Sequence, residues 1–149
     1  MIVDASIAIS GSKAAVWSVA TDIENAAKIL SGVESIEIVE RPPHGLVGLR
    51  WRETRIFFGK SATIEKRITE AGENQFFKTR AEGDGQVYLS NTTLTESAGV
   101  VTLSTSHDSQ AEGMAGKIML ATMGVLFKGM IRKALLQDLN DIKNAVERR

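Results

Sequence analysis

The amino-acid sequence predicts an α+β protein in which a curved antiparallel sheet of about seven strands wraps around a long C-terminal helix. Two observations lead to this fold class. Between residues 33 and 109, short segments of alternating polarity are separated by turn signals, which is typical of antiparallel hairpins. From Gly113 onward the apolar residues follow the helical period instead. Because the sheet has to cover its apolar face and only this last segment is long enough, we expect the two to pack together.

The chain begins with a strand and two short helices. Residues 2–9 alternate in polarity, as expected for a half-buried strand. Ser12 follows a glycine-containing break, and its hydroxyl can cap a helix predicted over residues 13–21. Asp22 is a possible cap for a second helix over residues 22–30, which a Ser-Gly pair ends.

Six more strands are predicted after the second helix. Turns that carry glycine, proline or asparagine separate them, and the short connections favour a meander of hairpins. The predicted strands span residues 33–41, 47–55, 61–69, 75–82, 86–95 and 100–109.

The C-terminal helix has two unlike halves. Its second half carries one apolar stripe, which is formed by Ile131, Leu135, Leu139, Ile142 and Val146. Its first half, residues 118–130, is apolar on nearly every side and has to be enclosed or to face apolar groups on two sides. Gly116, Gly124 and Gly129 indicate close packing, a bend or an opening motion, because each costs ~1 kcal/mol relative to alanine.

Length, charge balance and cysteine content exclude several classes of protein and of binding partner. The chain has 149 residues, which we interpret as a single domain over residues 1–149. Its 18 basic and 18 acidic side chains cancel, which argues against a nucleic-acid binder and a polybasic membrane-surface domain. The absence of cysteine excludes disulfides and thiol catalysis. No signal-peptide pattern is visible, and the longest apolar run, residues 118–127, is too short to span a bilayer. We therefore expect a cytoplasmic monomer or homodimer.

Motifs along the whole chain form a recognisable combination. They are Ile7-Ala8-Ile9 with Val16-Trp17 and Asp22, Ser31-Gly32-Val33 with Ile36-Glu37-Ile38, and the closing Leu139-Asn140-Asp141-Ile142-Lys143. This combination resembles the START-like, or SRPBCC, superfamily, which includes polyketide cyclases and dehydratases, pollen-allergen lipid carriers and lipid-transfer domains. Gly45 and Gly48 depart from the Gly-x-Gly pair that relatives often carry before the third strand. The resemblance implies a helix-grip fold with a ligand cavity beneath the terminal helix, but no particular reaction.

The strand predicted over residues 47–55 carries the first candidate site. Glu53 and Arg55 follow Trp51 with the same parity. If this parity holds, all three side chains point into the predicted cavity, where the charged pair could orient a polar ligand head. If the strand bulges near Thr54, both charged groups reach solvent instead.

His107 is the second candidate, because it shares its parity with Leu103 and Thr105. An inward-pointing histidine could act as a general base, whereas a histidine near a strand end often has no catalytic role. Glu53, Arg55 and His107 are thus the candidate catalytic residues. The two histidines stand far apart, and no loop is rich in carboxylates or built to cradle a phosphate. We therefore expect neither a metal nor a cofactor.

Two further sets are candidates for lining a ligand site. Asn91 and Thr93 line up with Leu89, and this row either hydrogen-bonds a ligand or is the solvent face of its strand. The second set is formed by four large apolar side chains of the last helix, which either contact a ligand or fill the core: Met119, Met123, Phe127 and Met130.

These observations support three functions. The preferred one is binding or transport of a small hydrophobic or amphipathic molecule, which the resemblance suggests to be lipid- or polyketide-like. The first alternative is a polyketide cyclase- or dehydratase-like enzyme that uses the same cavity. The second is a ligand-free interaction module whose apolar half-helix docks a partner.

Overall fold

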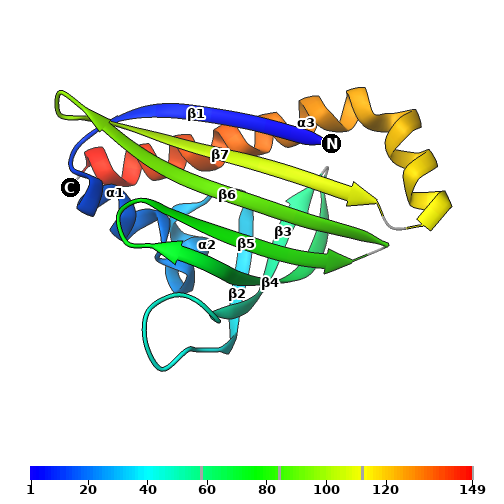
Figure 1. Cartoon of the computed structure of the whole chain (residues 1–149), viewed down its shortest axis with the longest axis horizontal. Coiled ribbons are helices and arrows are strands. Elements are labelled where there is room, and N and C mark those ends of the chain that lie inside the picture. The colour runs from blue at the N-terminus through cyan, green and yellow to red at the C-terminus, as the bar shows by residue number, and fades with distance from the viewer. Residues whose placement is uncertain (58, 84, 112, 149) are drawn as a thin grey trace.

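A seven-stranded antiparallel sheet and one long helix make up most of the molecule (Figure 1). The structure is a computed structural model that describes residues 1–57, 59–83, 85–111 and 113–148, without the side chains of residues 57, 115, 116, 119–123 and 125. The strands lie in the order β1-β7-β6-β5-β4-β3-β2. Strand β1 lies at one edge of the sheet and pairs with β7. From β2 to β7, each strand pairs with the next strand in the sequence. The predicted fold class and the meander are confirmed.

The bounds of the elements follow the polarity pattern closely. The strands are β1 (Ile2–Ser10), β2 (Val33–Glu40), β3 (Arg50–Phe57), β4 (Lys60–Gly72), β5 (Phe76–Gly83), β6 (Gln86–Ser97) and β7 (Val100–Ala111). The helices are α1 (Lys13–Ala20), the short 3-10 helix η1 (Ile23–Asn25), α2 (Ala26–Ile29) and α3 (Gly113–Glu147). No helix within the described ranges has the length and apolarity needed to cross a membrane.

Local sequence explains where several elements begin and end. The Ser12 hydroxyl accepts a hydrogen bond from the backbone N–H of Ala15 at 3.1 Å, as predicted for the cap of α1. The carboxylate of Asp22 instead accepts hydrogen bonds from the Asn25 side chain, and the predicted second helix is divided into η1 and α2. Ala98 and Gly99, the two residues between β6 and β7, have positive φ angles of 52° and 80°. Positive φ at both positions is typical of a type I′ turn, whose twist matches that of the two strands of a hairpin.

One strand begins later than predicted. The sequence pattern starts the strand at Val47, but β3 begins at Arg50, and Val47 is exposed. Gly48 adopts a φ of 97°, which interrupts an extended backbone before Leu49. The parity from Leu49 onward is unaffected, because Leu49 and Trp51 are both buried.

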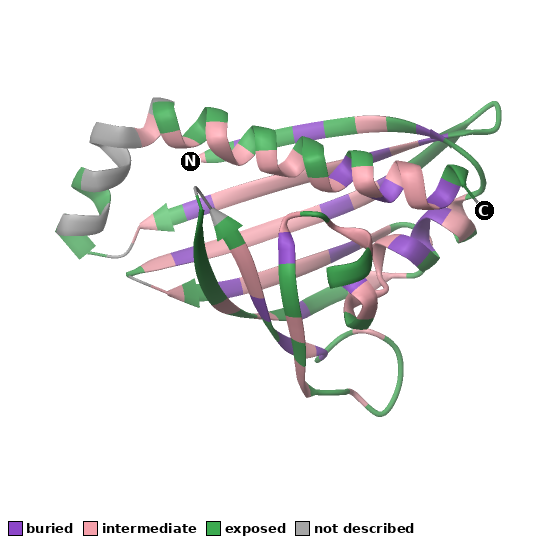
Figure 2. Ribbon diagram, turned by 180° about the vertical axis from the view of Figure 1, so that it is seen from behind, coloured by how far each residue is buried: buried purple, intermediate pink, exposed green. Residues whose placement is uncertain are grey.

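The core lies between the sheet and the second half of α3 (Figure 2). Leu139, Ile142 and Val146, three members of the predicted stripe, are buried there. They belong to one cluster with residues of α1 and of the sheet face that is turned toward α3, namely Ile9, Val16, Trp17, Trp51, Ile68, Phe77, Leu94, Val101 and Leu103. Helix α3 packs mainly on β1, with further contacts to β7, α1 and α2. Its first turns lie beyond the strand ends, and the helix changes direction before it runs along the sheet (Figure 1).

Candidate functional site

The parity predicted for β3 holds, and no bulge intervenes near Thr54 in the pairing of β3 with β4. Trp51 and Glu53 are both buried, and the exposed fraction of Glu53 is 4%. Arg55, two residues further, points to the same side and reaches α3. Because neighbouring residues of a strand face opposite sides, Arg52 and Thr54 lie on the outer face. Both charged candidates therefore lie between the sheet and α3.

Two residues that the sequence interpretation missed complete an ionic cluster around Glu53 and Arg55. The guanidinium of Arg55 donates to Glu53 Oε2 at 2.6 Å and to both carboxylate oxygens of Asp138 at 3.1 and 2.7 Å. The ammonium of Lys66 donates to Glu53 Oε2 at 2.8 Å, and the indole N–H of Trp51 to Oε1 at 3.3 Å. The cluster joins β3, β4 and α3, and its two positive and two negative charges balance.

The cluster fixes the protonation of its members. Burial opposes the ionisation of Glu53, but the charges and hydrogen bonds of Lys66 and Arg55 outweigh it and lower the pKa of Glu53 to about 2. Burial likewise opposes the charge of Arg55, and the carboxylates of Asp138 and Glu53 outweigh it, so that the pKa of Arg55 is raised. Glu53 is thus a fixed anion near neutral pH and a poor proton acceptor.

His107 lies among neutral hydroxyl groups on the same face of the sheet. Its Nδ1 is 3.3 Å from Ser90 Oγ, its Nε2 is 3.2 Å from Ser109 Oγ, and its ring stacks on Tyr88 with centroids 6.0 Å apart. Burial, followed by the positive charge of Lys66, lowers the pKa of His107 to about 4. The imidazole is therefore neutral at pH 7 and keeps one nitrogen as an acceptor.

The lowered pKa of His107 predicts a pH dependence of stability. Between pH 6.5 and about 4 the unfolded chain binds a proton on this imidazole and the folded protein does not. The free energy of unfolding should therefore rise with pH across this window, and the slope should diminish in His107→Gln. Urea unfolding at several pH values measures the slope, and His44→Gln, at an exposed turn position, serves as the control. An equal slope in wild type and His107→Gln would contradict the assignment.

The row formed by Leu89, Asn91 and Thr93 does not face α3, so these residues do not share the inner face with the other candidates. In β6 it is Leu94 that belongs to the core and Thr92 that bonds Thr105 of β7 at 3.2 Å between hydroxyl oxygens. The residues between them face the opposite way, because side chains alternate along a strand. The row is the outer face of β6, which is the second interpretation that the sequence left open.

Of the other residues predicted to line a ligand site, some are buried in the core and some lie half-buried on α3. Trp51 and Leu103 are buried in the core, where they are packed by protein side chains. Phe127 and Met130 of α3 are half-buried. The side chains of Met119 and Met123 lie outside the described residues, so their contacts stay a prediction.

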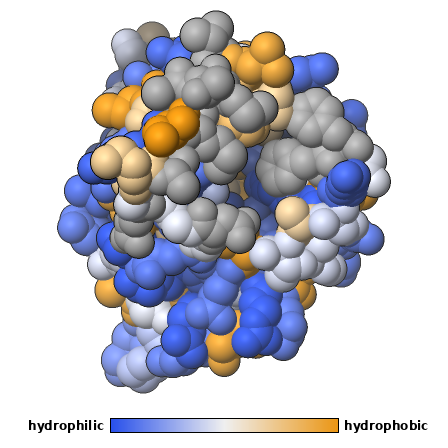
Figure 3. Space-filling view, turned by 90° about the vertical axis from the view of Figure 1, so that its right-hand side faces the viewer, coloured by the Kyte–Doolittle hydropathy of each residue, from blue (hydrophilic) through white to orange (hydrophobic). Residues whose placement is uncertain are grey.

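On the sheet face toward α3, inward side chains are buried near α1 and again at Ala81 and Ser109, and a half-buried stretch lies between them. Near α1, the inward side chains of β5, β6 and β7, such as Phe77, Leu94 and Leu103, are buried. Toward the start of α3, Thr79, Ser90 and Thr105 have the same inward orientation but are only half-buried. This end is hollowed in the space-filling view of Figure 3. Within the described residues, no group of metal-binding side chains gathers there or elsewhere.

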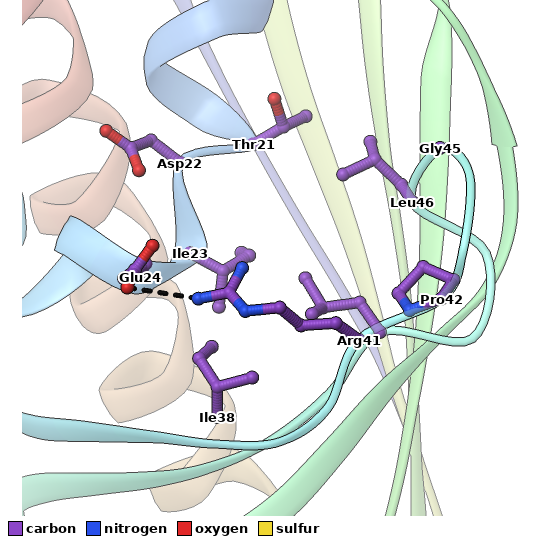
Figure 4. A pocket seen from close by; sticks show the side chains of 10 residues that line it. Thr21, Asp22, Ile23, Glu24, Ile38, Arg41, Pro42, Gly45 and Leu46 are labelled. Carbon is purple, nitrogen blue, oxygen red and sulfur yellow. Dashed lines mark ion pairs between the residues drawn. The ribbon is translucent and has the colours of Figure 1, made fainter.

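A separate hollow of about 210 Å³ lies at the loop between β2 and β3 (Figure 4). Ile23, Ile38 and Leu46 supply apolar walls, and Arg41 pairs with Glu24 at 3.0 Å across its rim. None of the residues predicted to bind a ligand lines it. Because the predicted residues lie elsewhere, we regard the ionic cluster and the hydroxyl groups around His107 as the candidate site.

A curved antiparallel sheet folded about a C-terminal helix, with polar groups on the inner face, defines a helix-grip protein. The chain belongs to the family described as polyketide cyclase / dehydrase and lipid transport, whose model matches residues 1–141. The comparison with curated proteins finds no match.

Solved structures show the same fold at low sequence identity. TTHA0849 from Thermus thermophilus is 18% identical with a TM-score of 0.82, over 98% of this chain and 97% of that one. The Zhui aromatase/cyclase from Streptomyces sp. R1128 is 17% identical with a TM-score of 0.78, over 100% of this chain and 94% of that one. A START superfamily protein from Mycobacterium smegmatis is 14% identical with a TM-score of 0.78, over 99% of this chain and 97% of that one.

Proposed function

We propose that this protein binds a small amphipathic molecule between the sheet and the first half of α3. The observation that carries the proposal is that Thr79, Ser90 and Thr105 are only half-buried, although they face the helix. Half-buried side chains on an inner face indicate space that the protein's own side chains do not fill. The family description, which includes lipid transport, supports the same function.

The lining of this space favours a ligand with one polar edge and one apolar side. The sheet contributes neutral hydrogen-bonding groups, among them Ser90, Thr105 and His107. Helix α3 contributes the apolar Phe127 and Ile131, both half-buried. The charged groups of the ionic cluster satisfy one another, so a ligand that carries hydroxyl or carbonyl groups suits the site better than a strongly charged one.

Filling this space with a larger side chain tests the proposal. In Thr105→Phe a phenyl ring occupies the inner face, and we expect binding of the neutral fluorescent probe N-phenyl-1-naphthylamine to weaken by about tenfold or more. The matched control is Ser106→Phe, because the neighbouring residue of β7 points to the outer face. Fluorescence titration of the folded variants measures both affinities. Equal affinity in Thr105→Phe and wild type, or no saturable binding by wild type, would contradict the proposal.

A cyclase- or dehydratase-like enzyme is the second candidate, because Glu53, Arg55 and His107 all lie on the inner face. His107 is the group best suited to accept a proton, since it is neutral and Glu53 is held as an anion. Mass spectrometry of the molecule that co-purifies with the protein discriminates the two functions. A carrier releases that molecule unchanged after prolonged incubation, whereas an enzyme converts it.

A further inference from the structure

We infer that the open end of the molecule docks on the surface of an anionic lipid bilayer through the first half of α3. The inference goes beyond ligand binding and does not require it. It rests on three features of this end: exposed apolar side chains, a local excess of positive charge, and the position of both beside the opening.

Large apolar side chains stand out into solvent along this part of α3. The exposed fractions of Met114, Ile118 and Leu126 are 76%, 58% and 71%. Met114 and Ile118 are four residues apart and share one side of the helix, and Leu126 follows about two turns later. Ile56, close to the tip of the β3–β4 hairpin at the same end, is 52% exposed. Exposed apolar groups gathered at one place are a feature of interaction surfaces.

The same segment is positively charged, although the whole chain is neutral. Residues 113–137 contain four basic side chains and no acidic one. Lys117 and Lys128 are exposed, and neither forms an ion pair with the part of the chain that the structure describes. Lys60 adds an exposed charge at the hairpin tip. The chain as a whole is therefore neutral, but this end of the molecule carries an excess of positive charge.

A bilayer fits this surface better than a protein partner does. Protein interfaces are depleted of lysine at their centres, whereas helices that lie at a membrane surface combine lysines with inserted apolar residues. Each lysine near an anionic surface adds attraction that salt screens. The first turns of α3 also project beyond the strand ends, so they can reach a flat surface without obstruction by the sheet (Figure 1). Apolar side chains and polar ones lie next to each other on the face that Figure 3 shows.

Co-sedimentation of the full chain with vesicles tests the inference. We expect binding to vesicles of phosphatidylcholine mixed with phosphatidylglycerol, weaker binding at high salt, and little binding to phosphatidylcholine alone. Lys117→Gln combined with Lys128→Gln should weaken binding by roughly tenfold to thirtyfold. Met114→Ser combined with Leu126→Ser should weaken it through loss of insertion. The matched controls are Lys28→Gln in α2 and Val100→Ser at the start of β7, which are exposed elsewhere and should bind as wild type does.

Three results would overturn the inference. They are absence of vesicle binding by the wild type, equal binding to charged and uncharged vesicles, and wild-type binding by both double variants. Sedimentation of the protein alone at several concentrations examines a second copy as the partner. Self-association that the apolar double variant abolishes would assign this surface to a dimer and would also overturn the inference. Probe titration of the same variants reports separately on ligand binding, so the two proposals can fail independently.

Discussion

Replacing Leu139 by alanine is expected to lower the free energy of unfolding by about 3 kcal/mol. The exposed fraction of Leu139 is 2%, and its side chain belongs to the cluster that joins α3 to the sheet. Truncation removes the apolar contact and leaves a cavity, because helix and sheet cannot collapse toward each other without disturbing the neighbouring Ile142. Urea unfolding followed by circular dichroism measures the change.

Leu136 is the matched control for this prediction. It lies in the same helix, one turn earlier, with an exposed fraction of 42%. Leu136→Ala should change the free energy of unfolding by less than about 1 kcal/mol, because alanine also favours the helix and little buried area is lost. Equal losses in the two variants would mean that the second half of α3 does not pack on the sheet through the predicted stripe.

The stripe shows why the fold could be predicted from the sequence. A period of 3.6 residues over a long segment and a period of two over several short ones leave few ways to bury all apolar faces. Leu139, Ile142 and Val146 therefore lie where the pattern places them. The fine placement of element ends depends on single residues instead. Gly48, with its positive φ, delays the start of β3, and no periodicity signals such a turn.

The candidate site could be predicted only in part, because each hairpin turn decides which faces of two strands coincide. In the β6–β7 hairpin only Ala98 and Gly99 separate the paired Ser97 and Val100. Counting back from this turn pairs His107 with Ser90, so Asn91 has to face away from His107. When the two strands are considered separately, the polarity pattern leaves open which row of β6 shares the inner face with His107.

The same counting would have found Lys66 but not Asp138. From the pairing of Phe57 with Lys60, Trp51 is opposite Lys66, which places this lysine diagonally to Glu53 on one face. The sequence contains this information, because Gly59 indicates the turn that sets the pairing of β3 with β4. Asp138 comes from α3, and its contact with Arg55 depends on how the helix lies on the sheet. No local pattern contains this information.

Replacing Arg55 by alanine is expected to lower the free energy of unfolding by about 3 kcal/mol, because it leaves two carboxylates without their partner. Asp138 then has no ion pair among the described residues, and Glu53 keeps only Lys66. Arg52→Ala is the matched control in the same strand. Arg52 points outward, half-exposed, with Glu37 at 3.3 Å, and its loss should cost less than about 1 kcal/mol. Urea unfolding of both variants measures the two losses.

A double variant separates the loss of an attraction from the exposure of an unpaired charge. Arg55→Met combined with Asp138→Leu removes both members of the bidentate pair and leaves the pair of Glu53 and Lys66 intact. A buried charge without a partner is more costly than an apolar group of similar size, so the double variant should unfold at a higher urea concentration than Arg55→Ala. A double variant less stable than Arg55→Ala would mean that the cluster itself stabilises the fold. The opposite, expected result would mean that most of the loss in Arg55→Ala comes from a buried carboxylate left without its partner. A double variant more stable than the wild type would mean that these buried charges are retained at a cost in stability, which is understandable where they shape the polar side of a ligand site.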